Sequence, residues 1–166
     1  ERAGRFSAIY ANGQERGWSH KSGIKHLDSL NNFISCQHND DGEHAELGQI
    51  WVELQNLMWK NVGVLRTGLK LKKTLLRLRS IRENLEEVTP AKGQAFNLTL
   101  QDWFDLRSGL LTAEAVTLSA LNRTESRGAH QREDFPETKE SFERNQSISL
   151  DMNGSLNSSF VASKNL

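Results

Sequence analysis

Ten residues between positions 123 and 134 bring together the side chains of this chain that are best suited to polar chemistry. Arginine offers a planar fork of donors for carboxylates, so alternating Arg and Asp or Glu in an irregular segment can fasten one domain to another. A solvated turn, with exposed ion pairs worth about 0–1 kcal/mol each, explains the pattern equally well. The residues alone leave both interpretations open. They are Arg123, Glu125, Ser126, Arg127, Gly128, Ala129, His130, Arg132, Glu133 and Asp134.

Two further sets of residues could bind a ligand. A histidine- and cysteine-containing connector could hold zinc, but a structural zinc site usually repeats a tight pair of ligands, so surface histidines are favoured. A basic run could contact phosphates, but the same stretch ends in glutamates and has no aromatic residue for base stacking, which favours a solvated helix face. The first set is His20, His26, Cys36, His38 and His44, and the second is Lys70, Lys72, Lys73, Arg77, Arg79 and Arg82.

The tryptophans at 51, 59 and 103 could form an exposed docking patch, although burial in a core is the commoner use of such residues. Each indole N–H then needs a hydrogen-bond partner.

Complete catalytic motifs are missing from the sequence. Its serines and its one cysteine do not lie in a nucleophile-elbow context, and GxGxxG and GxxxxGK do not occur. We therefore expect no catalytic, cofactor-binding or metal-binding residue in this chain. An independent nucleotide-dependent enzyme is the function class that these absences disfavour most.

Three apolar stripes at helical spacing must position residues 123–134, which we call the polar segment. They predict a first helix over 43–62 and a second that begins after Thr67 as N-cap and ends before Pro90. The third helix carries the stripe that begins at Trp103, and Gly128 supplies the left-handed residue that ends it. Three helices of about 20 residues with short connections predict an all-α fold, an antiparallel three-helix bundle. The stripes are Leu47, Ile50, Leu54, Leu57, Met58 and Val62; Leu71, Leu75, Leu78, Ile81, Leu85 and Val88; and Trp103, Leu106, Leu110, Ala113, Val116 or Thr117, and Ala120.

The rest of the chain divides around this bundle. Residues 1–12 suggest a helix without an N-cap, as at the tail of an upstream domain, and 13–42 form a polar connector with one short helix around 24–35. The bundle with its polar segment occupies 43–136. Residues 137–166 form an irregular, extended C-terminal arm in which 147–150 allow one short strand.

Composition limits the classes of partner. The 166 residues include 36% hydrophobic and 25% charged residues, with 21 basic and 21 acidic side chains, so no overall field steers the chain to nucleic acid. No run is apolar and long enough for direct membrane insertion. The single cysteine favours a reducing, cytoplasmic location.

Two segments resemble the succinate dehydrogenase and fumarate reductase flavoprotein family. RTESRGAHQREDFP at 123–136 is similar to a signature near the C-terminus of these proteins, and LMWKNVGVLR at 57–66 looks like the start of their C-terminal helical domain. Residues 1–11 look like the last helix of their flavin-binding domain. The related L-aspartate oxidases share the domain but usually lack the Arg–x–Asp found at Arg132 and Asp134, which favours the succinate/fumarate type.

The resemblance implies a spectrin-repeat-like bundle that packs on an upstream flavin-binding domain. FAD and the catalytic residues would belong to that domain of the parent protein, with none in this fragment, which alone is expected to be inactive. An iron–sulfur subunit is an implied partner, and partner subunits could hold the parent at the inner face of a membrane. The residues expected at the interdomain contact are Glu125, Ser126, Arg127, His130, Arg132 and Asp134, with Arg as fork donors, Asp as acceptor and His as a tunable partner.

A different class of function is a free-standing helical interaction module without a flavoprotein parent. It would bind a partner through Trp51, Trp59 or the basic helix face. The coding sequence upstream of Glu1 discriminates the two hypotheses, because only the first requires a GxGxxG flavin domain there.

Overall fold

The computed structural model describes residues 24, 28, 43–87, 97–151 and 154–161. The chain divides into two compact units, 1–38 and 39–166, and the helices α3 to α5 and all the strands described below belong to the second. Ile24 and Asp28 are helical. The expected tail helix at 1–12, the other residues of the 13–42 connector and the loop at 88–96 lie outside the described residues.

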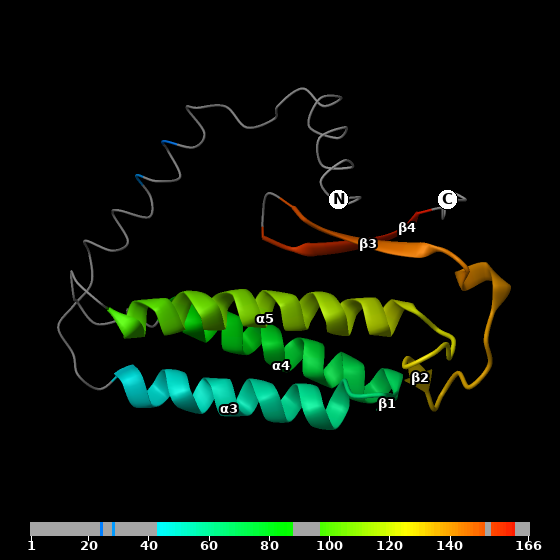
Figure 1. Cartoon of the computed structure of the whole chain (residues 1–166), viewed down its shortest axis with the longest axis horizontal. Helices are drawn as coiled ribbons and strands as arrows, with labels where there is room; N and C mark the ends of the chain where they lie inside the picture. The colour runs from blue at the N-terminus through cyan, green and yellow to red at the C-terminus, as the bar shows by residue number, and fades with distance from the viewer. Residues whose placement is uncertain (1–23, 25–27, 29–42, 88–96, 152–153, 162–166) are drawn as a thin grey trace, which may run out of the picture. The chain divides into compact units, whose positions relative to one another are not determined.

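Three long helices form the body of the second unit: α3 (Glu43–Asn61), α4 (Gly68–Glu87) and α5 (Leu98–Asn122). They lie alongside one another in Figure 1, and α5 runs antiparallel to α4, because Leu71 packs on Ala120 at one end and Trp103 bonds to Leu85 at the other. The predicted three-helix bundle is therefore confirmed.

The helix ends follow the capping signals in the sequence. Thr67 precedes α4, and its Oγ1 accepts a hydrogen bond from the N–H of Lys70 at 3.3 Å, as an N-cap does. The side chain of Asn97 accepts from the N–H of Leu100 at 3.0 Å and caps α5. The prediction for the end of α5 was wrong: this helix ends at Asn122 with extended Arg123 as its C-cap, well before Gly128.

The core lies where the apolar stripes meet. Its fully buried residues include most of the predicted positions, and Thr117 rather than exposed Val116 faces inward on α5. A leucine core of this kind supplies most of a small domain's stability at about 25 cal/mol per Å² of apolar area buried. The buried apolar residues are Leu47, Leu54, Val62, Leu71, Leu75, Leu78, Ile81, Leu85, Trp103, Leu106, Leu110, Ala113 and Ala120.

The tryptophans have different environments. Trp103 is buried and its indole N–H donates to the carbonyl of Leu85 at 3.1 Å, which satisfies the group as expected. Trp51 is half-buried against Gly109 of α5, whereas Trp59 is 84% exposed near the end of α3. Of the three, only Trp59 stands free of the bundle core.

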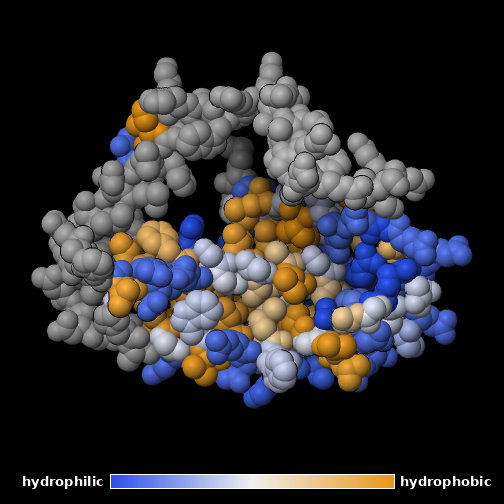
Figure 2. All heavy atoms as spheres, in the orientation of Figure 1, coloured by the Kyte–Doolittle hydropathy of each residue, from blue (hydrophilic) through white to orange (hydrophobic). Residues whose placement is uncertain are grey.

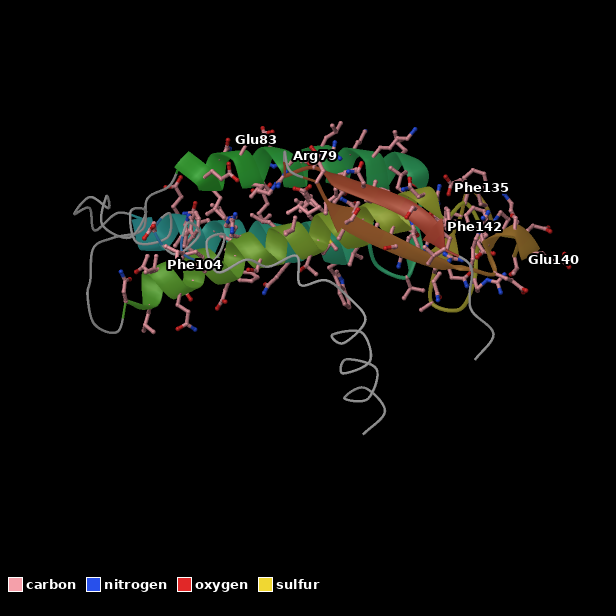
Figure 3. All side chains as sticks on the ribbon, turned by 90° about the horizontal axis from the view of Figure 1, so that it is seen from above. Arg79, Glu83, Phe104, Phe135, Glu140 and Phe142 are labelled. Carbon is pink, nitrogen blue, oxygen red and sulfur yellow. The ribbon has the colours of Figure 1, made fainter. Side chains whose placement is uncertain are left out.

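A buried glutamate interrupts the apolar surface between α4 and α5. Glu114 of α5 lies 2.9 Å from Arg82 and 3.9 Å from Arg79, both on α4, and Figure 3 shows Arg79 and Glu83 on that helix. Burial raises the pKa of Glu114 above its usual value, an effect that the two arginines oppose. The basic run on α4 is thus partly engaged inside the domain, and Arg77 likewise pairs with Glu53 at 2.6 Å.

Short strands follow the helices. Two-residue strands β1 (Leu65–Arg66) and β2 (Gln131–Arg132) pair in parallel. After the 3-10 helix η1 (Glu140–Phe142), β3 (Asn145–Leu150) and β4 (Leu156–Val161) form an antiparallel hairpin in which Ser147 faces Ser159, and this hairpin packs beside α5. The segment expected to be an irregular arm with one strand therefore forms two paired strands.

Hydrophilic side chains concentrate at one end of this unit. Figure 2 shows them gathered where the segment after α5 lies, while apolar side chains are prominent along the helices. No helix among the described residues is both long enough and apolar enough to cross a membrane.

Candidate functional site

The polar segment returns to the bundle by pairing with the turn between α3 and α4. Gln131 donates its N–H to the carbonyl of Val64 at 3.1 Å, and Glu133 donates to the carbonyl of Arg66 at 3.0 Å. These bonds form the β1–β2 pair. The two stretches that carry the family resemblance thus lie against each other, although they are more than 60 positions apart in the sequence.

A tight turn precedes this pairing. Arg127 and His130 exchange backbone hydrogen bonds of 2.8 and 3.0 Å, and Gly128 has φ +57°. This is the left-handed region that favours glycine. The expectation of a left-handed glycine was therefore correct, but its place is the tip of this turn, where Gly128 and Ala129 are exposed.

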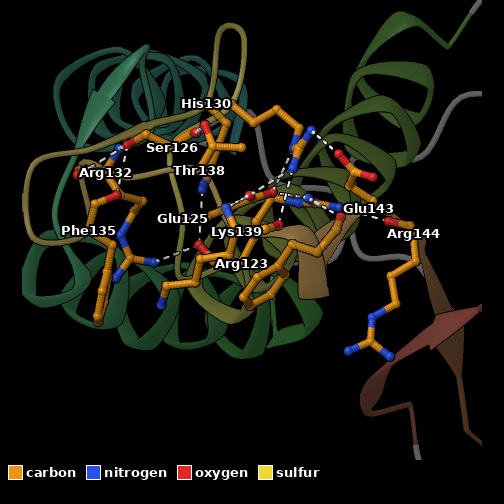
Figure 4. Close-up of polar contacts among 12 residues, drawn as sticks. Arg123, Glu125, Ser126, His130, Arg132, Phe135, Thr138, Lys139, Glu143 and Arg144 are labelled. Carbon is orange, nitrogen blue, oxygen red and sulfur yellow. Dashed lines mark hydrogen bonds and ion pairs between the residues drawn. The ribbon is translucent and has the colours of Figure 1, made fainter.

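Glu125 is the buried acceptor of the segment. Its carboxylate, 0% exposed, accepts from Arg123, from Nε and Nη2 of Arg127 at 3.0 and 3.2 Å, and from the N–H of Lys139 at 2.8 Å (Figure 4). Burial alone would raise the pKa of Glu125, but these hydrogen bonds outweigh it and lower the pKa to about 2. Glu125 is therefore charged at neutral pH and ties 123–127 to 139.

Ser126 holds the two sides of the segment together. Its hydroxyl accepts from the N–H of Arg132 at 2.8 Å and donates to the carbonyl of Phe135 at 2.9 Å. Its backbone N–H donates to Glu137 at 3.0 Å, and its carbonyl accepts from the hydroxyl of Thr138 at 2.8 Å. Every polar group of Ser126 is therefore satisfied within the domain.

Arg132 and Asp134 together cap two helices. Arg132, 2% exposed, donates from Nη1 to the carbonyls of Ala120, Leu121 and Arg123 at 3.0, 3.1 and 3.3 Å, at the C-terminal end of α5. Its Nε and Nη2 form a bidentate pair with Asp134 at 2.8 and 2.9 Å.

The carboxylate of Asp134 in turn accepts from the N–H of Gly68, the first residue of α4, at 2.9 Å. A cation thus lies at a helix C-terminus and an anion at a helix N-terminus, the placement that the helix dipoles favour. The hydrogen bonds from Arg132 and Gly68 lower the pKa of Asp134. A Cβ at position 68 would come within 2.9 Å of Asp134 and 3.0 Å of Arg132, so glycine there permits the close approach.

His130 connects β1 to the end of α5. Its Nδ1 lies 3.2 Å from Nη1 of Arg66, and its Nε2 lies 3.0 Å from the carbonyl of Arg123. Because arginine only donates, Nδ1 must accept and the proton must sit on Nε2. Burial lowers the pKa of His130, and the neighbouring charges of Arg66, Arg132 and Arg123 lower it further, so the imidazole is neutral at pH 7.

The six residues expected at an interdomain contact fall into two groups. Glu125, Ser126 and Arg132 face inward and bond within the domain. The side chains of Arg127 and Asp134 are 38% and 37% exposed, and His130 is half-buried. Arg127, Asp134 and His130 are therefore accessible to another surface, while Glu125, Ser126 and Arg132 hold the polar segment in its conformation.

Several partners in this network were not among the predicted residues. The carboxylate of Glu125 needs the backbone of Lys139, and His130 needs Arg66, which appeared only as the last letter of the LMWKNVGVLR match. A hollow of about 500 Å³ beside the network is lined by Arg123, Arg127, His130, Phe142, Glu143, Arg144 and Asn145.

Metal binding finds no support in the part of the chain that the structure describes, where no group of three His, Cys, Asp or Glu side chains is placed to hold an ion. The candidate ligands His20, His26, Cys36 and His38 lie outside the described residues. His44 lies in the first turn of α3, but its side chain is not among those described.

Comparison with known proteins identifies the family. The model of the fumarate reductase flavoprotein C-terminal region matches residues 51–158, which include the second half of α3, all of α4 and α5, the polar segment and most of the hairpin. The chain belongs to the succinate dehydrogenase and fumarate reductase flavoprotein family and corresponds to its C-terminal domain, as the two signature segments indicated.

Its relatives are much longer proteins, one of them named as an FAD-dependent oxidoreductase. The chain is 43% identical over 93 residues to an uncharacterized FAD-dependent oxidoreductase of Methanocaldococcus jannaschii, covering 56% of this chain and 16% of that protein. It is 38% identical over 92 residues to one subunit of the CoM/CoB fumarate reductase of Methanothermobacter marburgensis, covering 55% and 17%. The FrdA chain of E. coli quinol fumarate reductase superposes with a TM-score of 0.79 at 25% identity, covering 99% of this chain and 29% of FrdA. The chain thus spans about a sixth of the length of these first two relatives.

Proposed function

We propose that this chain is the supporting helical domain of an FAD-dependent flavoprotein of the succinate/fumarate type, and that it packs on the flavin-binding domain of that protein without taking part in catalysis. The observation that carries the proposal is the family match over 51–158. The similarity of 38% to a fumarate reductase subunit supports the succinate/fumarate assignment, although L-aspartate oxidases are similar at 29–34%.

The polar segment supplies the contact surface in this proposal. Its inner residues are bonded inside the domain, so the tip of the turn and the outer edges of Arg127 and Asp134 keep a fixed shape. A preorganised surface loses little conformational entropy on docking. We infer that the flavin-binding domain covers this outer edge, while Glu125, Ser126 and Arg132 act indirectly by holding it.

The partners of the whole protein are part of the same proposal. An iron–sulfur subunit would receive electrons from the flavin or deliver them to it, and such subunits would account for an association with the inner face of a membrane. Exposed Trp59 gives α3 a second candidate contact, since tryptophan is enriched at the centres of protein interfaces.

Substitution at Ala129 tests the docking without disturbing the network. Ala129 is exposed at the tip of the turn, so Ala129→Trp should leave the melting temperature of the 166-residue chain within about 2 °C of the parent chain. In the full-length flavoprotein the same change should obstruct docking, with faster proteolysis between the domains and lower flavin content. Glu83→Trp, on the exposed face of α4, is the matched control.

Wild-type flavin content and protease resistance in the full-length Ala129→Trp protein would overturn the proposed contact.

A further inference from the structure

A second hollow, of about 360 Å³, opens on the outer side of α5 beside the polar segment. Arg66, His130 and Arg123 line its polar side, Val116 and Ser119 of α5 its floor, and Gln146 of β3 its far edge. The floor is completed by the small side chains of Ala115 and Ala120. The hollow thus combines a basic wall with a largely apolar floor.

Arg66 contributes a half-buried cation to this wall. Its Nε donates to the carbonyl of Gly63 at 2.7 Å and its Nη1 to His130 at 3.2 Å. Both contacts fix the guanidinium in place, and among the described residues Nη2 has no hydrogen-bond partner. A positioned donor group therefore remains available at the hollow.

The charge of Arg66 is also uncompensated within the described part of the chain. The carboxylates of the polar segment that form ion pairs do so with other arginines, Glu125 with Arg123 and Arg127, and Asp134 with Arg132. Burial lowers the pKa of Arg66, and the positive charge of Arg132 lowers it further, without an opposing carboxylate. A partly desolvated cation without an anion is unfavourable, and an anion supplied from outside would relieve it.

We propose that this Arg66 hollow binds a carboxylate group attached to a short aliphatic chain. The carboxylate accepts from Nη2 of Arg66, a charge-assisted hydrogen bond of the kind that arginine makes best. The aliphatic part lies on Val116 and Ala115, where it covers apolar surface. A free small acid and the side chain of a glutamate present the same chemistry to the site.

Titration of the 166-residue chain followed by NMR tests the proposal. Sodium butyrate represents a free acid and N-acetyl-L-glutamic acid α-amide represents a protein side chain, with sodium chloride at equal ionic strength as the blank. We expect saturable shifts of the Val116 methyl and His130 ring signals with both carboxylates beyond the effect of chloride. Tighter binding of the glutamyl compound assigns the site to a glutamate side chain, and tighter binding of butyrate assigns it to a free acid.

Two variants and a control complete the experiment. Arg66→Gln removes the cation, and Val116→Trp fills the hollow from an exposed position without touching Arg66, so each should weaken binding at least tenfold. Arg107→Gln, which removes an exposed arginine elsewhere on α5, should leave binding unchanged. Absence of saturation, or equal binding in the folded Val116→Trp chain, overturns the proposal.

Discussion

Replacing Arg132 by methionine removes the residue that joins the ends of α4 and α5. Methionine keeps much of the side-chain length but leaves Asp134 without its bidentate partner and the carbonyls of Ala120 and Leu121 without the donor that Arg132 supplies. Breaking a buried charge pair costs about 3–5 kcal/mol, and the lower value applies because Asp134 is 37% exposed and keeps its bond to Gly68. The buried carbonyl of Ala120 adds about 1 kcal/mol. The free energy of unfolding should therefore fall by about 4 kcal/mol.

Urea denaturation followed by circular dichroism measures this loss, and thermal unfolding should show a melting temperature lower by roughly 10–15 °C. Arg107→Met is the matched control, because Arg107 is exposed on the same helix and its described contact is with the ring of Trp103, 6.0 Å away. That change should cost less than about 1 kcal/mol. A loss below about 1 kcal/mol for Arg132→Met as well would refute the double-capping role of Arg132.

Four other changes test separate parts of the structure. Gly68→Ala should destabilise the chain despite the higher helix propensity of alanine, because the new Cβ would press on Asp134 and Arg132, and a higher melting temperature would contradict this close approach. Glu125→Gln should lower the free energy of unfolding by about 2–3 kcal/mol at pH 7. It should also abolish the loss of stability that the parent chain shows between pH 4.5 and about 2, where the folded chain keeps Glu125 charged and the unfolded chain protonates it. Equal acid profiles for the two chains would exclude this role. Replacing Glu114 and Arg82 together by leucine should be neutral or stabilising, because both members of the pair are removed. Since the folded-state pKa of Glu114 is raised, the double change should also remove a loss of stability as pH rises above 4.5, and a large destabilisation would show that the pair is needed. His130→Gln should remove a loss of stability as pH falls below 6.5, because the native state keeps His130 neutral while the unfolded chain takes up the proton. An unchanged profile in equilibrium denaturation from pH 7.5 to 5 would contradict the lowered pKa of His130.

Helix positions followed from the sequence because their signals are local. The leucines of α4 repeat at helical spacing between Thr67 and Pro90, and the structure forms that helix from Gly68 to Glu87. The end of α5 was misplaced because Gly128 satisfies a glycine signal that a turn uses as well as a helix end does. The β3–β4 hairpin was largely missed because its strands are polar and pack only one face on α5.

The polar segment could be recognised from its composition, but most of its hydrogen bonds and ion pairs could not be predicted. Arg132 and Asp134 are two residues apart, so their pairing was foreseeable, whereas their bonds to Ala120 and Gly68 depend on how three helices converge. Long-range convergence of this kind leaves no spacing signal in one sequence. For the same reason, the sequence does not show that three of the residues expected at the interdomain contact, Glu125, Ser126 and Arg132, are buried within this domain.

Amide hydrogen exchange over residues 127–134 tests most directly whether the flavin-binding domain covers this segment. The measurement compares the 166-residue chain with the full-length flavoprotein at one pH and temperature. The exposed amides of Gly128 and Ala129 at the tip of the turn should exchange at least tenfold more slowly in the full-length protein, while exposed positions on α4 near Glu83 keep the same rate. Equal exchange of Gly128 and Ala129 in both proteins would contradict the proposed docking surface.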